Sequence, residues 1–291
     1  MKKTIRFLIF SLILLTTLAL ARTATFDGGT NLLWNVAANW DGPDTLPVAG
    51  DAVVIPNGFT VELDLAVTPN LLSITNVGTG TITADSAVVK TITATTITAN
   101  GTVPLISLLG VASTEIIGNI TNTSADTGDY TIHITSAVNV TFTGNLAGGT
   151  AGTTNYAVYN ATTGGILVTG NVAGDNNIGL YLNGIQTSCI IMGNTTGGDT
   201  AGASGVHNQT SGPLDFRGSV TGGLNATAYG LYNTSTTAVI KAHEFVFTSA
   251  TAVPHGGNCG ILDVSILNLN GMTYKTNLSI YTKDRYSIYG D

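Results

Sequence analysis

The chain has 291 residues, of which only 9% are Asp, Glu, Lys or Arg, and its pI is about 4.8. Ordinary soluble domains carry roughly 25% charged residues, so this composition excludes a coiled coil. The shortage of Lys and Arg also excludes a nucleic-acid-binding surface. With 43% hydrophobic residues and 36 glycines, the chain is too apolar for a disordered protein and favours β structure with many turns.

Residues 1–21 have the pattern of a secretory signal peptide. Basic residues at positions 2, 3 and 6 precede an uncharged run from Phe7 to Leu20, and Ala19-Leu20-Ala21 fits a small-residue cleavage site. The uncharged run is shorter than the roughly 20 residues that a spanning helix needs. We therefore expect a secreted, extracellular or cell-surface protein with no membrane span after signal removal.

Residues 22–50 contain both tryptophans, Trp34 and Trp40, and a cluster of turn residues. The next segments, such as Val53–Ile55 and Thr91–Thr93, have the composition of short strands. We interpret 22–50 as an N-terminal cap and the segments that follow as irregular coils of a repeated structure, because the end of such a structure must be covered.

From residue 115 to residue 261 the chain repeats itself with a period near 25 residues. The repeat is marked by glycines with spacings of 26, 26, 23 and 25 residues, namely Gly118, Gly144, Gly170, Gly193 and Gly218. Apolar residues stand two positions before and two positions after each glycine, with Thr195 as one exception, and this is the alternation of a β-strand. A unit this short cannot bury its own apolar face, so stacked units must share one core.

The sequence therefore predicts an all-β fold, a right-handed parallel β-helix of about eight or nine coils over residues 51–266. A leucine-rich repeat would need its consensus, and a propeller blade would need about 40 residues. Residues 267–291 change in composition and carry several tyrosines and basic residues. We interpret them as a C-terminal cap or tail that could also oligomerise, so homo-oligomer formation stays open.

The cap region resembles a known type of bacterial sequence. The residues that carry the resemblance are Trp34, Asn39, Trp40, Pro47, Gly50, Asp51, Val53, Ile55, Leu63 and Asp64. This segment is similar to the start of eight-glycine domains and of many bacterial secreted β-helix surface proteins. The resemblance implies an extracellular, adhesin-like right-handed parallel β-helix, and it brings no catalytic motif to this chain.

Two features of the repeat are expected to be structural. Asn119, Asn145, Asn171 and Asn194 fall at one position of successive coils, where stacked amides can hydrogen-bond from coil to coil. The two cysteines, Cys189 and Cys259, are about three coils apart, well beyond the reach of a disulfide. We expect two unpaired thiols and, because metal-ligand spacings are absent, no metal and no cofactor.

A column of aromatic and imidazole residues is the candidate ligand-binding feature. A second block recurs in each coil, from Tyr130-Thr-Ile-His133 through Tyr229-Gly-Leu-Tyr232 to a faded copy, His255-Gly-Gly-Asn258. Its last position is expected to point outward and holds His133, Tyr159, Tyr181, His207 and Tyr232. These rings can stack on one another and stabilise the wall, or they can contact glycans or a protein partner.

Catalysis requires a different set of residues. A glycoside hydrolase of β-helix type needs two carboxylates in one cleft, and a lyase needs a basic residue as well. The weak candidates are Asp215, Arg217, His243 and Glu244, which neighbouring coils bring together if Arg217 and His243 are equivalent. Glu244 stands where the repeat glycine is expected, so a charge that protects the end of the solenoid is the simpler explanation.

We favour a non-enzymatic role, a structural or adhesion protein that presents a low-charge repetitive wall to glycans, cell-surface components or other proteins. A polysaccharide lyase or glycoside hydrolase of β-helix type is one alternative. A virion-associated fibre or spike domain is another, and the signal peptide counts against it. The composition excludes nucleic acid as a partner.

Overall fold

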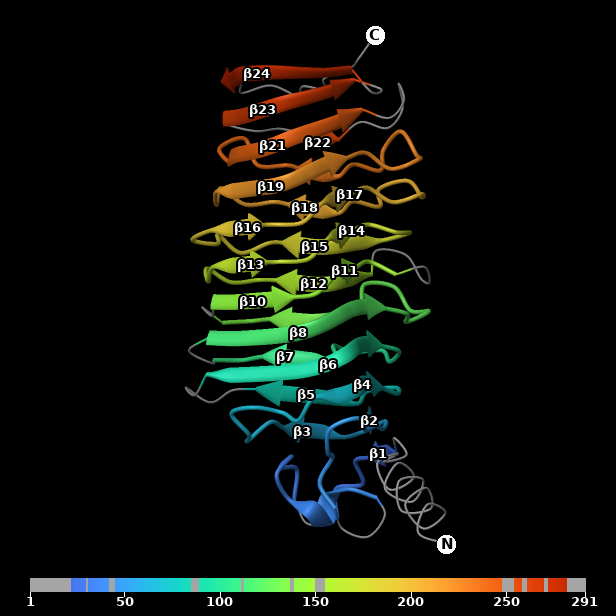
Figure 1. Cartoon of the computed structure of the whole chain (residues 1–291). Helices are drawn as coiled ribbons and strands as arrows, with labels where there is room; N and C mark the ends of the chain where they lie inside the picture. Colours follow the sequence, from blue (N-terminus) through green and yellow to red (C-terminus); the bar gives the residue numbers. More distant parts are fainter. Residues whose placement is uncertain are drawn as a thin grey trace, which may run out of the picture.

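A computed structural model describes residues 22–29, 31–41, 45–84, 89–110, 113–136, 139–149, 155–247, 254–257, 261–269 and 272–281. The expected signal peptide lies outside these residues. Within them the chain is an all-β parallel β-solenoid of about eight turns, with one short 3-10 helix, η1 (Ala37–Asn39), and no α-helix. The coils are stacked along one axis from the N-terminal to the C-terminal end (Figure 1).

One sheet of 15 strands extends along the whole solenoid. Its strands are β1 (Thr23–Thr25), β2 (Ala52–Ile55), β4 (Leu71–Asn76), β6 (Lys90–Ala99), β8 (Ser113–Asn122), β10 (Asn139–Thr143), β11 (Leu146–Ala147), β13 (Ile166–Val168), β14 (Val172–Ala173), β16 (Cys189–Ile191), β17 (Thr195–Thr196), β19 (Leu214–Thr221), β21 (Val239–Phe247), β23 (Ile261–Leu269) and β24 (Met272–Tyr281). The final pair, β23 with β24, is antiparallel, whereas the other pairs in this sheet are parallel.

A second sheet of nine strands closes the remaining side of the coils. It contains β3 (Thr60–Glu62), β5 (Thr81–Ala84), β7 (Ile106–Leu108), β9 (Tyr130–Ile134), β12 (Tyr156–Asn160), β15 (Ile178–Leu182), β18 (Val206–Asn208), β20 (Leu231–Asn233) and β22 (His255–Gly257). Gly144, Gly170 and Gly193 each separate two strands of the first sheet, for example β13 from β14, whereas Gly118 and Gly218 lie within the longer strands β8 and β19. The first sheet therefore turns a corner at the glycines, and the second sheet completes the coil.

The register between coils follows the predicted repeat. Ile166 of β13 pairs with Val140 below it and with Cys189 above it, and Cys189 pairs in turn with Leu214. The side chain of Cys189 is buried and its thiol is unpaired, as expected, and burial raises the pKa of Cys189 to about 12. Cys259 lies outside the described residues.

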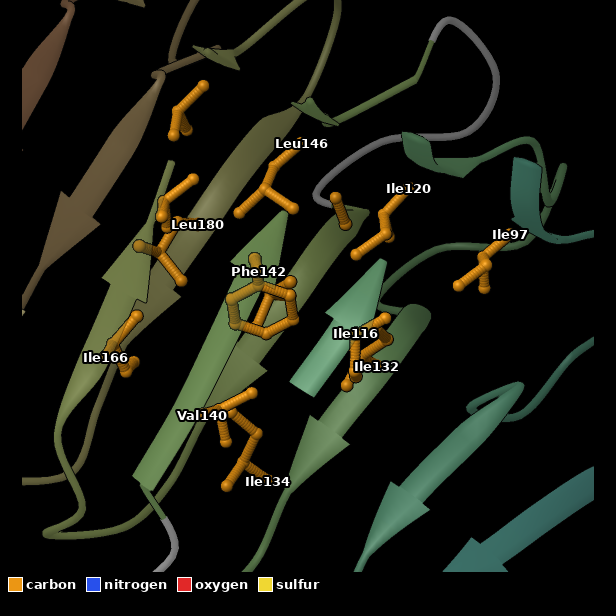
Figure 2. Close-up of a cluster of buried hydrophobic side chains, with 14 of the residues drawn as sticks. Ile97, Ile116, Ile120, Ile132, Ile134, Val140, Phe142, Leu146, Ile166 and Leu180 are labelled. Atoms are coloured by element: carbon orange, nitrogen blue, oxygen red, sulfur yellow. The ribbon is translucent and has the colours of Figure 1, made fainter. Parts of the chain in front are cut away.

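The inward side chains of the coils form continuous apolar rows. Figure 2 shows Ile116, Phe142 and Ile166 in the interior beside Ile132 and Leu180 of the opposite sheet. All of these side chains are at most 2% exposed. Burial of a single side chain of this size stabilises a fold by roughly 1.5–3 kcal/mol, so the rows supply most of the stability of the solenoid.

The corner between the two strands of the first sheet requires glycine. A Cβ atom on Gly144 would overlap the carbonyl oxygen of Gly118, and one on Gly170 would overlap that of Gly144. Gly118 and Gly144 also have φ values of 147° and 139°, which side chains rarely allow. The glycine spacing in the sequence therefore reflects a close backbone approach that is repeated at every coil.

The asparagine row beside the glycines is a hydrogen-bonded ladder. The Oδ1 atom of Asn119 accepts a hydrogen bond from the backbone N–H of Asn145 at 3.1 Å, and Asn145 accepts one from Asn171 at 3.0 Å. The ladder continues through Asn194 to the backbone N–H of Ser219. The structural interpretation of this row is confirmed, because each amide oxygen satisfies a backbone donor of the next coil.

The N-terminal end is covered by an aromatic cluster. The rings of Trp34 and Trp40 meet edge to face with centroids 4.8 Å apart, and Phe26 contacts Trp40 at 5.2 Å. The indole N–H of Trp40 donates to the backbone oxygen of Trp34 at 2.8 Å. The segment is also part of the first coil, because β1 pairs in parallel with β2.

No helix in the described part of the chain has the length and apolarity to cross a membrane.

A buried histidine ends the central inward row of the second sheet. This row consists of Val61, Ile82, Ile106, Ile132, Val158, Leu180, Val206 and Leu231, followed by His255. The pairing with Leu231 places His255 at the third position of the repeated block, so its alignment with Tyr229 in the sequence is wrong. The Nε2 atom of His255 has no hydrogen-bond partner, and burial lowers its pKa to about 4.

Replacement of Gly170 by alanine should destabilise the fold. The new Cβ would overlap the backbone of the coil below, and we expect a loss of about 1–3 kcal/mol in the free energy of unfolding, measured by urea denaturation. Gly165→Ala is the matched control, because its Cβ would meet side-chain oxygens of Asn139 and Ser188 at 3.0 and 3.1 Å, and these side chains can move. Equal losses in the two variants would contradict the close-approach explanation.

Replacement of His255 by leucine should reduce the acid sensitivity of the fold. The unfolded chain takes up a proton at His255 near its ordinary pKa of 6.5, whereas the folded chain does so only near 4. Stability contributed by the neutral ring is therefore complete above pH 6.5 and is lost as the pH falls toward 4. Between about pH 7.5 and about pH 4.5 the His255→Leu protein should lose roughly 2–3 kcal/mol less than the wild type in urea denaturation. An identical pH dependence in both proteins would refute this assignment.

Candidate functional site

An aromatic wall covers the outer face of the second sheet. We define the aromatic wall as eight residues on five successive coils, Tyr130, His133, Tyr156, Tyr159, Tyr181, His207, Tyr229 and Tyr232. The strands β9, β12, β15, β18 and β20 position these residues, and Tyr229 lies just before β20. Every one of the eight side chains is half-buried. The five rings predicted from the sequence are therefore brought together in one row on the outer face, and each is half-buried.

The rings of the aromatic wall contact one another without a break. Tyr159 stacks on Tyr181 with centroids 5.1 Å apart, and Tyr181 meets His207 edge to face at 4.8 Å. His207 then meets Tyr232 at 4.9 Å, and Tyr232 stacks on Tyr229 at 5.5 Å. These contacts restrict the orientation of the rings, because every ring of the wall touches at least one other.

The aromatic wall carries no formal charge at neutral pH. Burial lowers the pKa of His207 to about 4 and also lowers the pKa of His133, so both imidazoles are neutral. Burial raises the pKa of Tyr156 to about 12, with further contributions from the neighbouring tyrosines, and it raises the pKa of Tyr181 as well. The surface is therefore suited to an uncharged partner with apolar faces.

Three residues of the aromatic wall were missed as candidates from the sequence. Tyr130, Tyr156 and Tyr229 occupy the first position of the repeated block, and they lean onto the rings at the last position. The ring centroids of Tyr130 and Tyr159 are 4.6 Å apart, and those of Tyr156 and Tyr181 are 4.9 Å apart. The signal was present, since tyrosine recurs at the first position in three of the blocks. Alternation along a strand does not reveal that a position at its edge also faces outward.

A hollow, which we name the charged cleft, lies on the first sheet across β19, β21 and β23. It has a volume of about 430 Å³ and is lined by Asp215, Phe216, Arg217, Lys241, Ala242, His243, Asp263 and Ser265. Three of the four sequence-predicted catalytic candidates, Asp215, Arg217 and His243, thus lie together. The guanidinium of Arg217 already pairs with Asp215 at 3.0 Å, and Asp215, Lys241 and Asp263 form one row across the three strands.

The fourth candidate, Glu244, does not line the charged cleft. Its Oε1 atom accepts a hydrogen bond from the side-chain amide of Asn268 at 3.3 Å. The expectation that Glu244 takes the place of the repeat glycine is wrong, because Glu244 pairs with Ser219. The register shifts between Phe216 and Ser219, so β21 passes the corner with one residue fewer, and Glu244 occupies the asparagine position of the repeat.

The charged cleft has limited means for chemistry. Its two carboxylates, Asp215 and Asp263, are separated by two strand spacings, roughly 9–10 Å, with Lys241 between them. This backbone separation is near the upper limit of the carboxyl spacing of an inverting glycosidase and well above the roughly 5 Å of a retaining one. Over the described ranges of the chain, no group of three or more His, Cys, Asp or Glu side chains is arranged to hold a metal ion.

Comparison with known proteins adds no relative. No family model, no curated protein and no solved structure matches this chain. The structure shows the parallel β-solenoid fold that the resemblance to bacterial β-helix surface proteins implies, and the adhesin-like role remains a prediction.

Proposed function

We propose that this protein is a secreted or cell-surface β-solenoid that binds neutral glycans along its aromatic wall and does not cleave them. The observation that carries the proposal is the unbroken contact of eight half-buried rings over five coils. Rings that are already held in place lose little conformational freedom when a ligand binds, so they contribute contact area at low entropic cost.

The chemistry of the aromatic wall favours sugars over other partners. A sugar ring presents apolar C–H faces and a rim of hydroxyl groups, and tyrosine combines an apolar ring with a polar tip in the same way. The wall is uncharged because its histidines are neutral, so a neutral glycan is not repelled and an ionic partner is not attracted. The signal-peptide pattern of residues 1–21 supports a location outside the cytoplasm, where such glycans are found.

Removal of two stacked rings from the aromatic wall should weaken glycan binding. Tyr159→Ala combined with Tyr181→Ala deletes a stacked pair, and we expect at least a roughly tenfold loss of affinity for the neutral polysaccharides that the native protein binds. Affinity electrophoresis in gels that contain cellulose derivatives, xylan, mannan or glucan measures this loss. Ile185→Ala, at a side chain 61% exposed and outside the wall, is the control. If the double variant is retarded by the polysaccharide as strongly as the native protein, the wall is not the binding surface.

A polysaccharide-cleaving enzyme is the second candidate function, because Asp215, Arg217 and His243 line one cleft. Under our proposal the native protein releases no reducing ends and no unsaturated products from acidic or neutral polysaccharides. Release of such products that disappears in Asp215→Asn and persists in Glu244→Gln would replace the proposed function with catalysis in the charged cleft. The Glu244→Gln protein is the control, since Glu244 lies outside that cleft.

A further inference from the structure

The aromatic wall has one vacancy, by which we mean a coil with a small side chain at the first position of the repeated block. The first position of the repeated block holds Tyr130, Tyr156 and Ile178 in three successive coils, and these residues pair directly. In the next coil Val206 pairs with Leu180 and with Leu231, so the residue two positions earlier, Ser204, occupies the same place. Tyr229 restores a ring one coil later. A single small side chain therefore interrupts a row of large ones.

The vacancy forms a cleft with rings on its sides. A hollow of about 390 Å³ lies over Ser204, and the wall residues Tyr156, Tyr181, His207, Tyr229 and Tyr232 line it. We call this hollow the Ser204 cleft. Its volume is within the range of roughly 300–1,000 Å³ that small-molecule pockets occupy. Tyr156, Tyr181 and His207 come from β12, β15 and β18, which follow one another along the stack in Figure 1, and Tyr232 comes from β20.

Aromatic rings bound the Ser204 cleft along the stacking direction, and these rings are held by other contacts. On one side the ring centroids of Tyr156 and Tyr181 are 4.9 Å apart, and on the other Tyr229 stacks on Tyr232 with ring centroids 5.5 Å apart. A Cβ atom on Gly256 would overlap the ring of Tyr229, so Tyr229 extends over the glycine of the next coil. Tyr229 lines the Ser204 cleft from this position.

The lining of the Ser204 cleft is uncharged and polar at its edge. Among the residues that the structure describes, no Asp, Glu, Lys or Arg side chain contributes to it, and its histidine, His207, is neutral. Thr227 is exposed at the edge of the lining, whereas Ser204 is buried and its hydroxyl donates to the backbone oxygen of Gly202 at 3.4 Å. An ionised ligand would lose hydration on entry without gaining a partner charge, so the cleft favours a neutral ligand that can hydrogen-bond at its rim.

The rings beside the cleft meet at both steep and shallow angles. His207 is tilted by 76° from Tyr181 and by 68° from Tyr232, whereas Tyr229 and Tyr232 are within 12° of parallel. A flat aromatic molecule gains most from parallel faces or from one clean edge contact. A saturated sugar ring has C–H groups in several directions and can contact rings that meet at steep angles.

We propose that the Ser204 cleft binds one pyranose ring of an uncharged glycan and is the primary binding site of the aromatic wall. The inference rests on the proposed function and makes it more specific: the rest of the wall contributes weak contacts along the chain of the polysaccharide. A short neutral oligosaccharide should therefore occupy the cleft, whereas a long polymer should also contact the wall outside it.

Two variants that fill the Ser204 cleft test the proposal. Ser204→Tyr completes the interrupted row from the floor, and Thr227→Tyr adds a ring from an exposed position at the rim. The control is Thr237→Tyr, the same change at another exposed threonine in a turn, outside the cleft. Affinity is measured by isothermal titration calorimetry with cellohexaose, mannohexaose, xylohexaose and chitohexaose, and thermal unfolding verifies that each variant is folded.

We expect the native protein and Thr237→Tyr to bind at least one neutral hexasaccharide with one site per chain, and both cleft variants to lose at least tenfold in affinity. Gels that contain the polysaccharide should still retard the cleft variants, but less than they retard the native protein. Undiminished hexasaccharide binding in Thr227→Tyr, or preference for hexagalacturonate or for indole over all neutral sugars, would overturn the cleft as a sugar site. Absence of any binding to polymer or hexasaccharide by the native protein would instead overturn the proposed function itself.

Discussion

Parallel pairing of successive coils in fixed register is the constraint on which the whole structure depends. Along the paired strands the N–H and C=O groups of one coil bond to C=O and N–H groups of the next, so each paired residue lies about 4.8 Å from its counterpart. Rows of like residues follow directly, with Ile, Leu and Val inward, glycine at the corner and asparagine beside it. The glycine row exists because the carbonyl of one coil occupies the place of a Cβ atom in the next.

The same constraint accounts for the 9% of charged residues. Identical charges stacked at strand spacing repel one another, and opposite charges must alternate from coil to coil to coexist. The chain alternates them at Asp215, Lys241 and Asp263. Elsewhere a buried charge is satisfied by backbone groups, as at Lys90, whose ammonium donates to the carbonyl oxygens of Leu63 and Leu65 at 2.7 and 3.1 Å. Uncharged rings and amides can be repeated without this restriction, and they form the aromatic wall and the asparagine ladder.

The rows could be predicted from the sequence because the spacing of the repeat determines which residues pair between coils. Gly170 and Asn171 recur with the period of the coil, and the structure pairs them as the spacing indicates. Glu244 and His255 could not be placed in this way. Near Glu244 one residue is missing from the corner, and His255 belongs to a coil whose block no longer resembles the others. A single deletion shifts every later residue to another row, and only the backbone pairing reveals where it falls.

The candidate site could be predicted only in part, for a related reason. The last position of each block gave five rings of the aromatic wall, but the Ser204 cleft is defined by a residue that departs from the pattern. In a stacked structure a departure from the repeat has a three-dimensional meaning that the same change in a loop does not have. A serine between Ile178 and Tyr229 at strand spacing replaces a large side chain with a small one, and rings of the surrounding coils line the opening. The repeat therefore provides a rigid, uniform surface, and a local loss of the repeat is the simplest way for such a surface to acquire a specific site.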